Sequence, residues 1–517
     1  MTPLTRFPSA LLSALLLACS GSALQAADVV PKGYNTTIPE DVLTPDRVQT
    51  RIGTFNYFDG FPDDDTMAKA RRQVDLGRGV QTFLNFMPAA SLEMLYVGHR
   101  DGYGMQVNRD IGLFEELMSS KSLWLTGNTD TVYATAFLDL SKGPIVVEVP
   151  AGTGPGTVND AFFRFVVDMG GPGPDKGKGG KYLIVGPGQT APANTEGYFV
   201  ANTPSKINWL ILRGFLDDQG KTDTARNAFK GGLKVYPYSE RANPPANNFK
   251  NLTDWETNTI HANNFKFYEE LDEVIQREPS DLFSPELLGM ASSIGIEKGK
   301  PFNPSPEQKA LLTEAVAIGN ATARSILFGP KDPKNYIYPG KAGYWQTGFP
   351  GGSHEYLVDK GNGGRDMDGR TLFFYLATVN TPAMALEIPG VGSQYAFSSR
   401  DGSGAYLNGS NTYKLNIPAN PPAQKFWSFV VYDPQTRSML QTGEMPYPSK
   451  NNKRNADMVK NADGSIDLYF GPQAPTGMEA NWVKTVPGKG WFGIFRLYGP
   501  GQEWFDRTWK LGDIEKV

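Results

Sequence analysis

Short β-prone runs separated by glycine- and proline-rich connections fill two long stretches of this chain, residues 123–238 and 371–517. Runs of β-branched and aromatic residues bounded by turn-forming residues predict strands. Glycine and proline contribute 57 and 39 of the 517 residues without a fixed period, which indicates many turns rather than collagen or disorder. Several short strands at this spacing are typical of a β-sandwich. The strands predicted in the first stretch are 134–140, 145–149, 162–169, 182–185 and 209–215.

The second β-rich stretch contains two strong hairpin turns, Asp401-Gly402 and Asn408-Gly409. We predict strands around and after them, at residues 405–407, 412–417, 426–432, 466–470 and 491–498.

Helical patterns come before each β-rich stretch. Three aspartates at 63–65 precede a helical pattern at 66–89, where their charges suit the positive end of the helix dipole. We expect Pro88 to break this helix and residues 92–97 to extend it. Residues 251–328 are helical again, and Ser305-Pro306 is a good helix start. The order helix, β, helix, β predicts two β domains with helical layers before and between them.

The N-terminus has the pattern of an export signal. A positive Arg6 is followed by a short apolar run at 10–18 and small residues at 20–27. Cleavage after Ala26 would release a soluble periplasmic or secreted protein. The alternative is a lipid anchor at Cys19, but the residue before Ala18 matches the lipid-attachment pattern poorly, so we favour soluble release. No other apolar stretch reaches the roughly 20 residues that a membrane span needs.

Several classes of chemistry and partner are excluded by composition. Cys19 is the only cysteine, so a protein cleaved after Ala26 has no disulfide, no thiolate nucleophile and no cysteine-ligated metal. A formal net charge of −4 without a basic run argues against a nucleic-acid partner. The three histidines are far apart and form no His-Glu-x-x-His motif, so we expect neither a metal site nor a cofactor.

The strongest candidate site is a polar cluster in the first β stretch. Asp130 and Tyr133 are candidate catalytic residues, as base and proton donor, and Asn128, Arg164 and Asp168 are candidate ligand-binding residues. Arg164 and Asp168 are an even number apart on a predicted strand, so we expect them to share a face. The structural alternative is a local Asx turn followed by a buried ion pair that fixes strand register.

Two further candidates lie outside that cluster. His354 and Glu355 follow a glycine turn, which would expose an imidazole and a carboxylate side by side as catalytic groups; the alternative is a solvated loop. Trp427 belongs to a set of tryptophans in the last hundred residues. Some of these tryptophans must lie in the core, because the interior of a sandwich contains aromatic side chains. Any that face a concave surface would suit an amphipathic or ring-containing ligand.

Both β stretches resemble known families. The hexad 128–133 and the run 137–150 after it, with residues 164–168, 179–187 and 209–213, resemble domain of unknown function 1254. The C-terminal stretch resembles domain of unknown function 1214, but residues 481–487 depart from its usual Asn-Trp-Leu-Pro-Ala-Pro pattern, so its ligand could differ from that of relatives. The matching C-terminal residues are 407–409, 413, 421–422, 426–428, 432–433, 463–465, 481–482, 496–500 and 509.

The resemblance implies a mainly β fold with a helical insert. An immunoglobulin-like β-sandwich is expected at 123–240, a helical insert at 241–345 and a jelly-roll-like β-sandwich at 346–517. The signal peptide (1–26) and a lead-in with a helical segment (27–122) precede them.

The families that the chain resembles imply no established reaction. We expect an exported protein that binds or processes a small or amphipathic molecule between its two β domains, without metal or thiol chemistry. One alternative is a metal-independent hydrolase or lyase, and another is a structural or envelope-associated interaction protein. The sequence leaves the ligand and the oligomeric state open.

Overall fold

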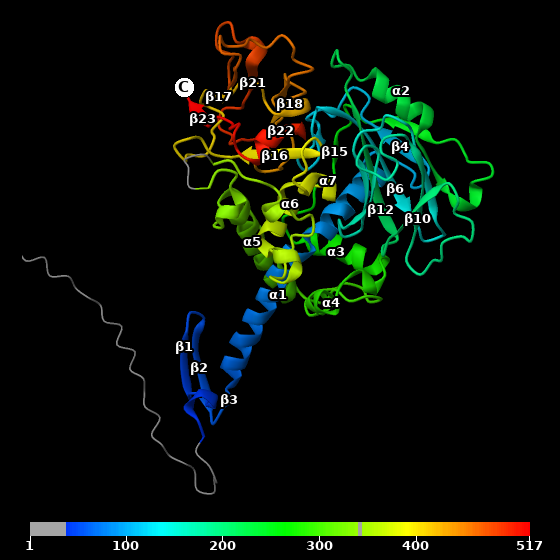
Figure 1. Cartoon of the computed structure of the whole chain (residues 1–517). Helices are drawn as coiled ribbons and strands as arrows, with labels where there is room; N and C mark the ends of the chain where they lie inside the picture. The colour runs from blue at the N-terminus through cyan, green and yellow to red at the C-terminus, as the bar shows by residue number, and fades with distance from the viewer. Residues whose placement is uncertain (1–37, 340–343) are drawn as a thin grey trace, which may run out of the picture. The chain divides into compact units, whose positions relative to one another are not determined.

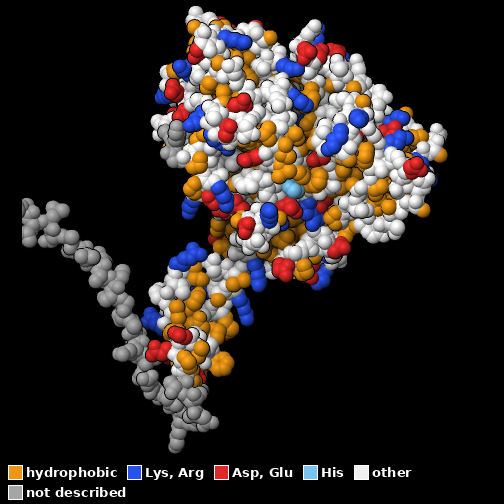
Figure 2. Space-filling model, viewed as in Figure 1, with side chains coloured by type: hydrophobic (Ala, Val, Ile, Leu, Met, Phe, Trp, Pro, Cys, Tyr) orange, Lys and Arg blue, Asp and Glu red, His pale blue; other side chains and the backbone are white. Residues whose placement is uncertain are grey.

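The computed structural model describes residues 38–339 and 344–517 (Figure 1). The expected signal peptide and Cys19 lie outside the described residues. The chain divides into two compact units at Val74. Charged side chains of both signs are interspersed on the face shown in Figure 2, without a large field of one sign. Within the described residues, none of the helices combines the length and the apolar character needed to span a bilayer.

The first unit contains a small antiparallel sheet, ordered β1-β2-β3. Its backbone connects to the helix that follows: the Thr66 hydroxyl accepts a 2.9 Å hydrogen bond from the backbone N–H of Asn56. The elements are η1 (Glu40–Val42), β1 (Arg47–Thr50), β2 (Gly53–Phe58), β3 (Phe61–Pro62) and the start of α1 (Asp64–Val97).

The helix α1 is continuous through Pro88, so the predicted break is wrong. The residues around Pro88, among them Phe86, Met87 and Ala89, are fully buried in one core. Burial of this segment on all sides therefore outweighs the loss of one backbone hydrogen bond.

The first large β region is a sandwich of a six-stranded and a four-stranded sheet, ordered β14-β4-β6-β12-β8-β9 and β11-β10-β7-β13. Its long central pair is antiparallel, with Thr131 opposite Phe215 and Asp139 opposite Ile207. Aliphatic side chains such as Val132, Leu138 and Leu210 form the core. The strands are β4 (Asp110–Leu113), β6 (Thr131–Asp139), β7 (Ile145–Val149), β8 (Gly156–Asp160), β9 (Phe165–Met169), β10 (Gly180–Val185), β11 (Tyr198–Asn202), β12 (Ile207–Phe215), β13 (Lys234–Pro237) and β14 (Asn248–Asn251); β5 (Ser122–Leu123) pairs separately with β15 (Thr257–Asn258).

The C-terminal β region is a second sandwich, with sheets ordered β16-β22-β18-β19 and β21-β20-β17-β23. Aromatic side chains, including Trp427, Phe429 and Phe495, fill its core. The strands are β16 (Ser393–Ser398), β17 (Tyr413–Ile417), β18 (Ala423–Tyr432), β19 (Ser449–Asn451), β20 (Ile466–Gly471), β21 (Trp482–Lys484), β22 (Phe492–Pro500) and β23 (Ile514–Lys516). The expected fold class, two β-sandwiches with a helical insert between them, is confirmed.

Most of the helices lie along one side of the two sandwiches, below them in the view of Figure 1. The predicted start of α5 is confirmed, because the Ser305 hydroxyl accepts from the Gln308 amide and Pro306 is the first helical residue. Besides α1, the helices are α2 (Asp223–Gly232), α3 (Lys266–Arg277), α4 (Pro285–Ser292), α5 (Pro306–Phe328), α6 (Met367–Leu376), α7 (Pro382–Ala385) and α8 (Gln502–Phe505), with short turns η2 (Gly98–Gly102), η3 (Tyr238–Glu240), η4 (Ser280–Leu282), η5 (Pro333–Asn335), η6 (Pro350–Gly352), η7 (Val358–Gly361) and η8 (Glu479–Asn481).

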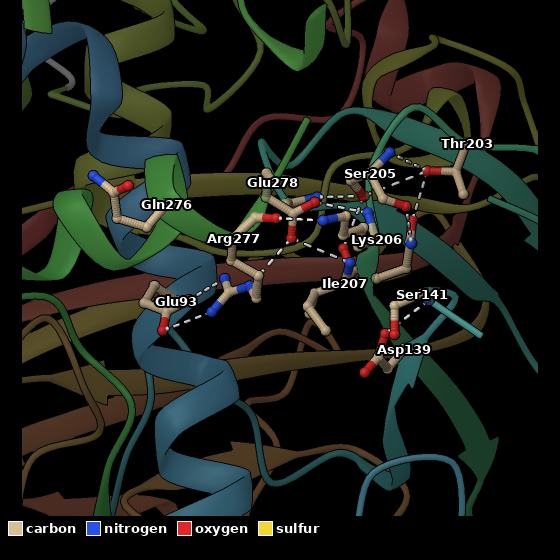
Figure 3. A network of polar contacts seen from close by, with 12 residues as sticks. Glu93, Asp139, Ser141, Thr203, Ser205, Lys206, Ile207, Gln276, Arg277 and Glu278 are labelled. Atoms are coloured by element: carbon tan, nitrogen blue, oxygen red, sulfur yellow. Dashed lines mark hydrogen bonds and ion pairs between the residues drawn. The ribbon is translucent and has the colours of Figure 1, made fainter. Parts of the chain in front are cut away.

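A polar network joins the helices to the first sandwich (Figure 3). Arg277, at the end of α3, donates to both oxygens of Glu93 on α1 and pairs with Glu278 at 3.2 Å. Glu278 in turn accepts from the backbone amides of Lys206, at 2.6 Å, and Ile207, at 3.2 Å. One partly buried arginine therefore connects α1 and α3 to the start of β12.

A third core lies between the sandwiches and the helices. It includes Phe86 of α1, Trp209 of β12, Phe374 of α6 and Phe397 of β16. The candidate site lies within this shared core.

Candidate functional site

Strands from both sandwiches line the site with the faces that point away from their own cores. On β22, Phe495 and Leu497 belong to the C-terminal core, whereas Arg496 faces the other way. On β12, Leu212 belongs to the first core, whereas Arg213 faces the shared one. Side chains alternate along a strand, so each strand serves two cores at once.

The loop before β6 is the main connection between the two sandwiches. Thr129 shares a 2.6 Å hydrogen bond with Ser449, and the carbonyl of Gly127 accepts one of 2.7 Å from the Tyr432 hydroxyl. The carbonyl of Thr126 accepts from Arg496 at 3.1 Å. The loop at residues 126–129 is therefore held by the C-terminal sheet.

Asp130 is the carboxylate at the centre of this connection, and it is completely buried. It accepts hydrogen bonds from the Ser428 hydroxyl, the Asn451 amide at 3.2 Å and the Tyr498 hydroxyl at 3.3 Å. All three donors come from the C-terminal sandwich. Asp130 is thus fully engaged by the neighbouring sandwich and lies behind the cavity wall rather than in it.

Asn128 and Tyr133 lie beside it and do line the cavity. The Asn128 side-chain oxygen accepts from the Asp130 amide at 2.9 Å, which is the Asx turn that the sequence allows, and its amide group donates to the Tyr133 hydroxyl. Burial raises the pKa of Tyr133 above its ordinary value, and the charges of Arg213 and Arg496 only partly offset this. The hydroxyl therefore stays protonated at neutral pH.

Two buried arginines face the same cavity, Arg213 from β12 and Arg496 from β22, with only 8% and 4% of their surfaces exposed. Arg496 donates 3.1 Å and 2.7 Å hydrogen bonds to Thr126 and Tyr432, but its Nη1 atom has no partner. Among the described residues, neither arginine forms an ion pair with a carboxylate.

Both arginines remain cations in this environment. Burial opposes their charges, yet the surrounding tyrosine oxygens raise the pKa of both groups above the ordinary value for arginine, and Asp130 adds to this for Arg496. The guanidinium of Arg213 lies over the Tyr133 ring and that of Arg496 over the Tyr432 ring, at 5.8 Å and 5.5 Å.

The cavity itself has a volume of about 60 Å³. Its lining residues include no carboxylate, histidine or lysine, so the arginines supply the charge, and aromatic and aliphatic side chains supply the apolar surface. The aromatic residues that line it are Trp124, Tyr133, Trp209, Phe349, Phe373, Tyr395 and Phe397.

The other residues singled out from the sequence lie elsewhere. Arg164, His354 and Glu355 line a second cavity of about 800 Å³. Asp168 accepts a 2.7 Å hydrogen bond from Thr381, and burial raises its pKa to about 6. Trp427 is buried in the C-terminal core beside Phe495, with 5.9 Å between the ring centres. The structure thus brings together Asn128, Asp130 and Tyr133. Asp168 lines a smaller adjoining pocket that shares Arg213 with the cavity, and the other residues lie apart from it.

A β-bulge separates Arg164 from Asp168. Asn159 pairs with Phe165 whereas Val158 pairs with Val167, so one residue of β9 is extra and the alternation shifts. Arg164 precedes the strand and pairs with the buried Asp160, with 2.7 Å between Nε and Oδ2. The expectation that Arg164 and Asp168 share a face is therefore wrong.

The described residues hold no group of three or more His, Cys, Asp and Glu placed to bind a metal ion. His99 and His261 are buried, and burial lowers their pKa values to about 4 and about 3, so both are neutral. His354 is half-buried, and desolvation lowers its pKa.

Sequence reasoning missed the two arginines that define the cavity. Arg213 ends the run Trp-Leu-Ile-Leu-Arg, and Arg496 interrupts an apolar strand in the same way. A lone arginine in a strand that is otherwise apolar on both faces is a detectable signal, because arginine is seldom fully buried without a partner.

Two family models and two solved structures are similar to this chain. Residues 110–237 match the family described as protein of unknown function DUF1254, and residues 392–502 match protein of unknown function DUF1214. The crystal structure of the VPA0106 protein from Vibrio parahaemolyticus is similar, with a TM-score of 0.51 and 18% identity over 86% of this chain and 100% of that one. An uncharacterized protein from Burkholderia cenocepacia has a TM-score of 0.37 and 10% identity over 87% and 96% of the two chains. None of the curated proteins matches the chain.

Proposed function

This chain carries a DUF1254 region followed by a DUF1214 region, and we propose that it binds a small carboxylate in the cavity between them. One observation carries the proposal: Arg213 and Arg496, two buried cations without an ion-paired carboxylate among the described residues, line the same cavity. We further propose that this binding takes place in the periplasm, in line with the export signal expected at the N-terminus.

The physical argument is charge compensation. A buried cation without a partner is costly, and a bound anion would remove that cost for both arginines at once. The unpartnered Nη1 atom of Arg496 offers a donor for it. Guanidinium groups bind carboxylates with paired, charge-assisted hydrogen bonds, which makes a carboxylate the favoured anion.

The cavity also limits the size and the shape of the ligand. A volume of about 60 Å³ accommodates only a few non-hydrogen atoms. The aromatic walls favour an apolar remainder over a second charged group. A short-chain carboxylate fits both conditions.

Binding is better supported than catalysis. Asp130 already accepts three hydrogen bonds and does not reach the cavity, and the residues that do reach it include no basic carboxylate, imidazole or amine. A hydrolase or lyase would use such a group, or a tyrosinate, as its base, and burial keeps the hydroxyl of Tyr133 protonated.

The test uses two tryptophans of the cavity wall, Trp124 and Trp209, as reporters. Butyrate should change their fluorescence and release heat in calorimetry, whereas butyramide, which has the same shape without the charge, should not. Arg213→Met and Arg496→Met should each weaken butyrate binding roughly 10- to 100-fold, the loss expected for a charge-assisted hydrogen bond.

Arg437→Met is the matched control for these variants. Arg437 is also a buried arginine over a tyrosine ring, 4.2 Å from Tyr375, but it does not line the cavity. Equal binding of butyrate and butyramide, or equal losses in all three variants, would contradict the proposal.

A further inference from the structure

A second and much larger cavity lies on the other side of α6. Phe373 of this helix lines the small cavity, whereas its neighbour Phe374 lines the large one, which has a volume of about 800 Å³. Most of the remaining wall comes from residues within 160–165, 282–287 and 354–356. No residue lines both cavities among those described, so this is a separate space.

The charges of this cavity are not balanced. Three arginines line it, and only Arg164 is neutralised, by its ion pair with Asp160. Arg370 is 8% exposed and donates a 3.1 Å hydrogen bond to the carbonyl of Asn85, but it forms no ion pair among the described residues. Arg365, on the exposed approach to α6, donates to the carbonyl of Glu355 and forms no ion pair among the described residues.

Arg365 and Arg370 are also close enough to repel each other. Burial, followed by the charge of Arg365, lowers the pKa of Arg370 to about 10. The two other carboxylates that line the cavity, Glu286 and Glu355, are exposed, and neither pairs with these arginines. Two cations held together without an intervening acid form a site for an external anion.

Apolar surface adjoins this charged end. The guanidinium of Arg370 lies over the rings of Phe162 and Phe374, at 5.1 Å and 5.8 Å. Phe162 packs edge-on against Phe283, with 5.2 Å between ring centres, and Leu287 continues the surface. A ligand that follows this wall would meet cationic and apolar surface in turn.

We propose that the large cavity binds an amphipathic anion, with a carboxylate or sulfonate head at Arg365 and Arg370 and an apolar body against Phe162, Phe283 and Leu287. This ligand is too large for the small cavity, so the site is additional to the one proposed above. His354 and Glu355 then lie at the wall of a binding cavity, where they would contact the ligand.

The test compares probes with one apolar chain and different heads. Decanoate and decanesulfonate should bind in calorimetry, decan-1-ol should bind roughly tenfold more weakly, and decylammonium should not bind, because only the anions compensate the two arginines. Arg365→Gln and Arg370→Met should each weaken decanoate binding by roughly tenfold or more.

Arg365→Gln keeps the test independent of folding, because this side chain is exposed. Lys360→Gln is its control, an exposed cation of the same segment that lines neither cavity. Equal affinity for decanoate and decan-1-ol would overturn the inference. So would decanoate binding that is lost in Arg213→Met but kept in Arg365→Gln and Arg370→Met, a result that would leave the proposal for the small cavity standing.

Discussion

Replacing Asp130 by leucine should strongly destabilise the protein. The change removes a completely buried carboxylate and leaves three buried donors, on Ser428, Asn451 and Tyr498, without their acceptor. At about 1–3 kcal/mol for each unsatisfied donor, the cost lies between about 3 and 9 kcal/mol. The two hydroxyls can rotate toward other acceptors, so we expect a loss of about 3–5 kcal/mol, as for other broken buried polar clusters.

The assay is urea unfolding followed by tryptophan fluorescence, with the free energy of unfolding extrapolated to water. Asp130→Asn is the matched variant, because it keeps the size and one acceptor oxygen, and the hydroxyls of Ser428 and Tyr498 can turn to accept from its amide. It should lose about half as much as Asp130→Leu. If Asp130→Leu unfolds within about 1 kcal/mol of the wild type, Asp130 does not hold the two sandwiches together and the reasoning fails.

Three further changes test other parts of the structure by the same unfolding assay. Arg213→Met removes an uncompensated buried charge, so without ligand it should cost less than about 1 kcal/mol or even stabilise the fold, whereas Leu210→Ala on the opposite face of β12 should cost about 2–5 kcal/mol. Arg277→Met strands the buried Glu93 carboxylate and should cost about 3–5 kcal/mol; a cost below about 1 kcal/mol would contradict the role of the network. Burial raises the pKa of Glu270 from 4.5 to about 7, so the folded protein keeps a proton that the unfolded chain releases, and its stability should fall by about 3 kcal/mol as the pH rises across that range. Glu270→Gln should remove this contribution and leave that of Asp168, whose pKa is raised to about 6, and an unchanged slope would refute the assignment.

The sequence predicts what depends on local structure. Most strand positions follow from β-branched and aromatic runs, although the strand predicted at 405–407 is wrong because no strand lies between β16 and β17 in the described part of the chain. The start of α5 follows from Ser305 and Pro306, and the Asx turn of Asn128 from the chemistry of its side chain. Each of these features is decided within a few residues of chain, so periodicity and turn chemistry are sufficient to find it.

The site depends on contacts between distant parts of the chain, and there the sequence is insufficient. Asp130 meets Ser428 and Asn451 across about three hundred residues, a pairing that no local pattern encodes. A single bulge in β9 moves Arg164 to a different cavity from the one expected. Alternation predicts which side chains share a face, but it does not predict which sheet that face will meet.

The cavity exists because β12 and β22 are each buried on both faces. Leu210 and Leu212 of β12 stabilise the first sandwich, while Trp209 and Ile211 belong to the core shared with the helices and the C-terminal sheet. Separating the two sandwiches would expose the apolar surface of that shared core to water. It would also remove the hydrogen-bond partners of buried polar groups such as Asp130. The arginines are therefore held on rigid strands that neither sandwich supports alone. A binding site built in this way is pre-organised by the pairing of the two regions, which is a physical reason for them to occur in one chain.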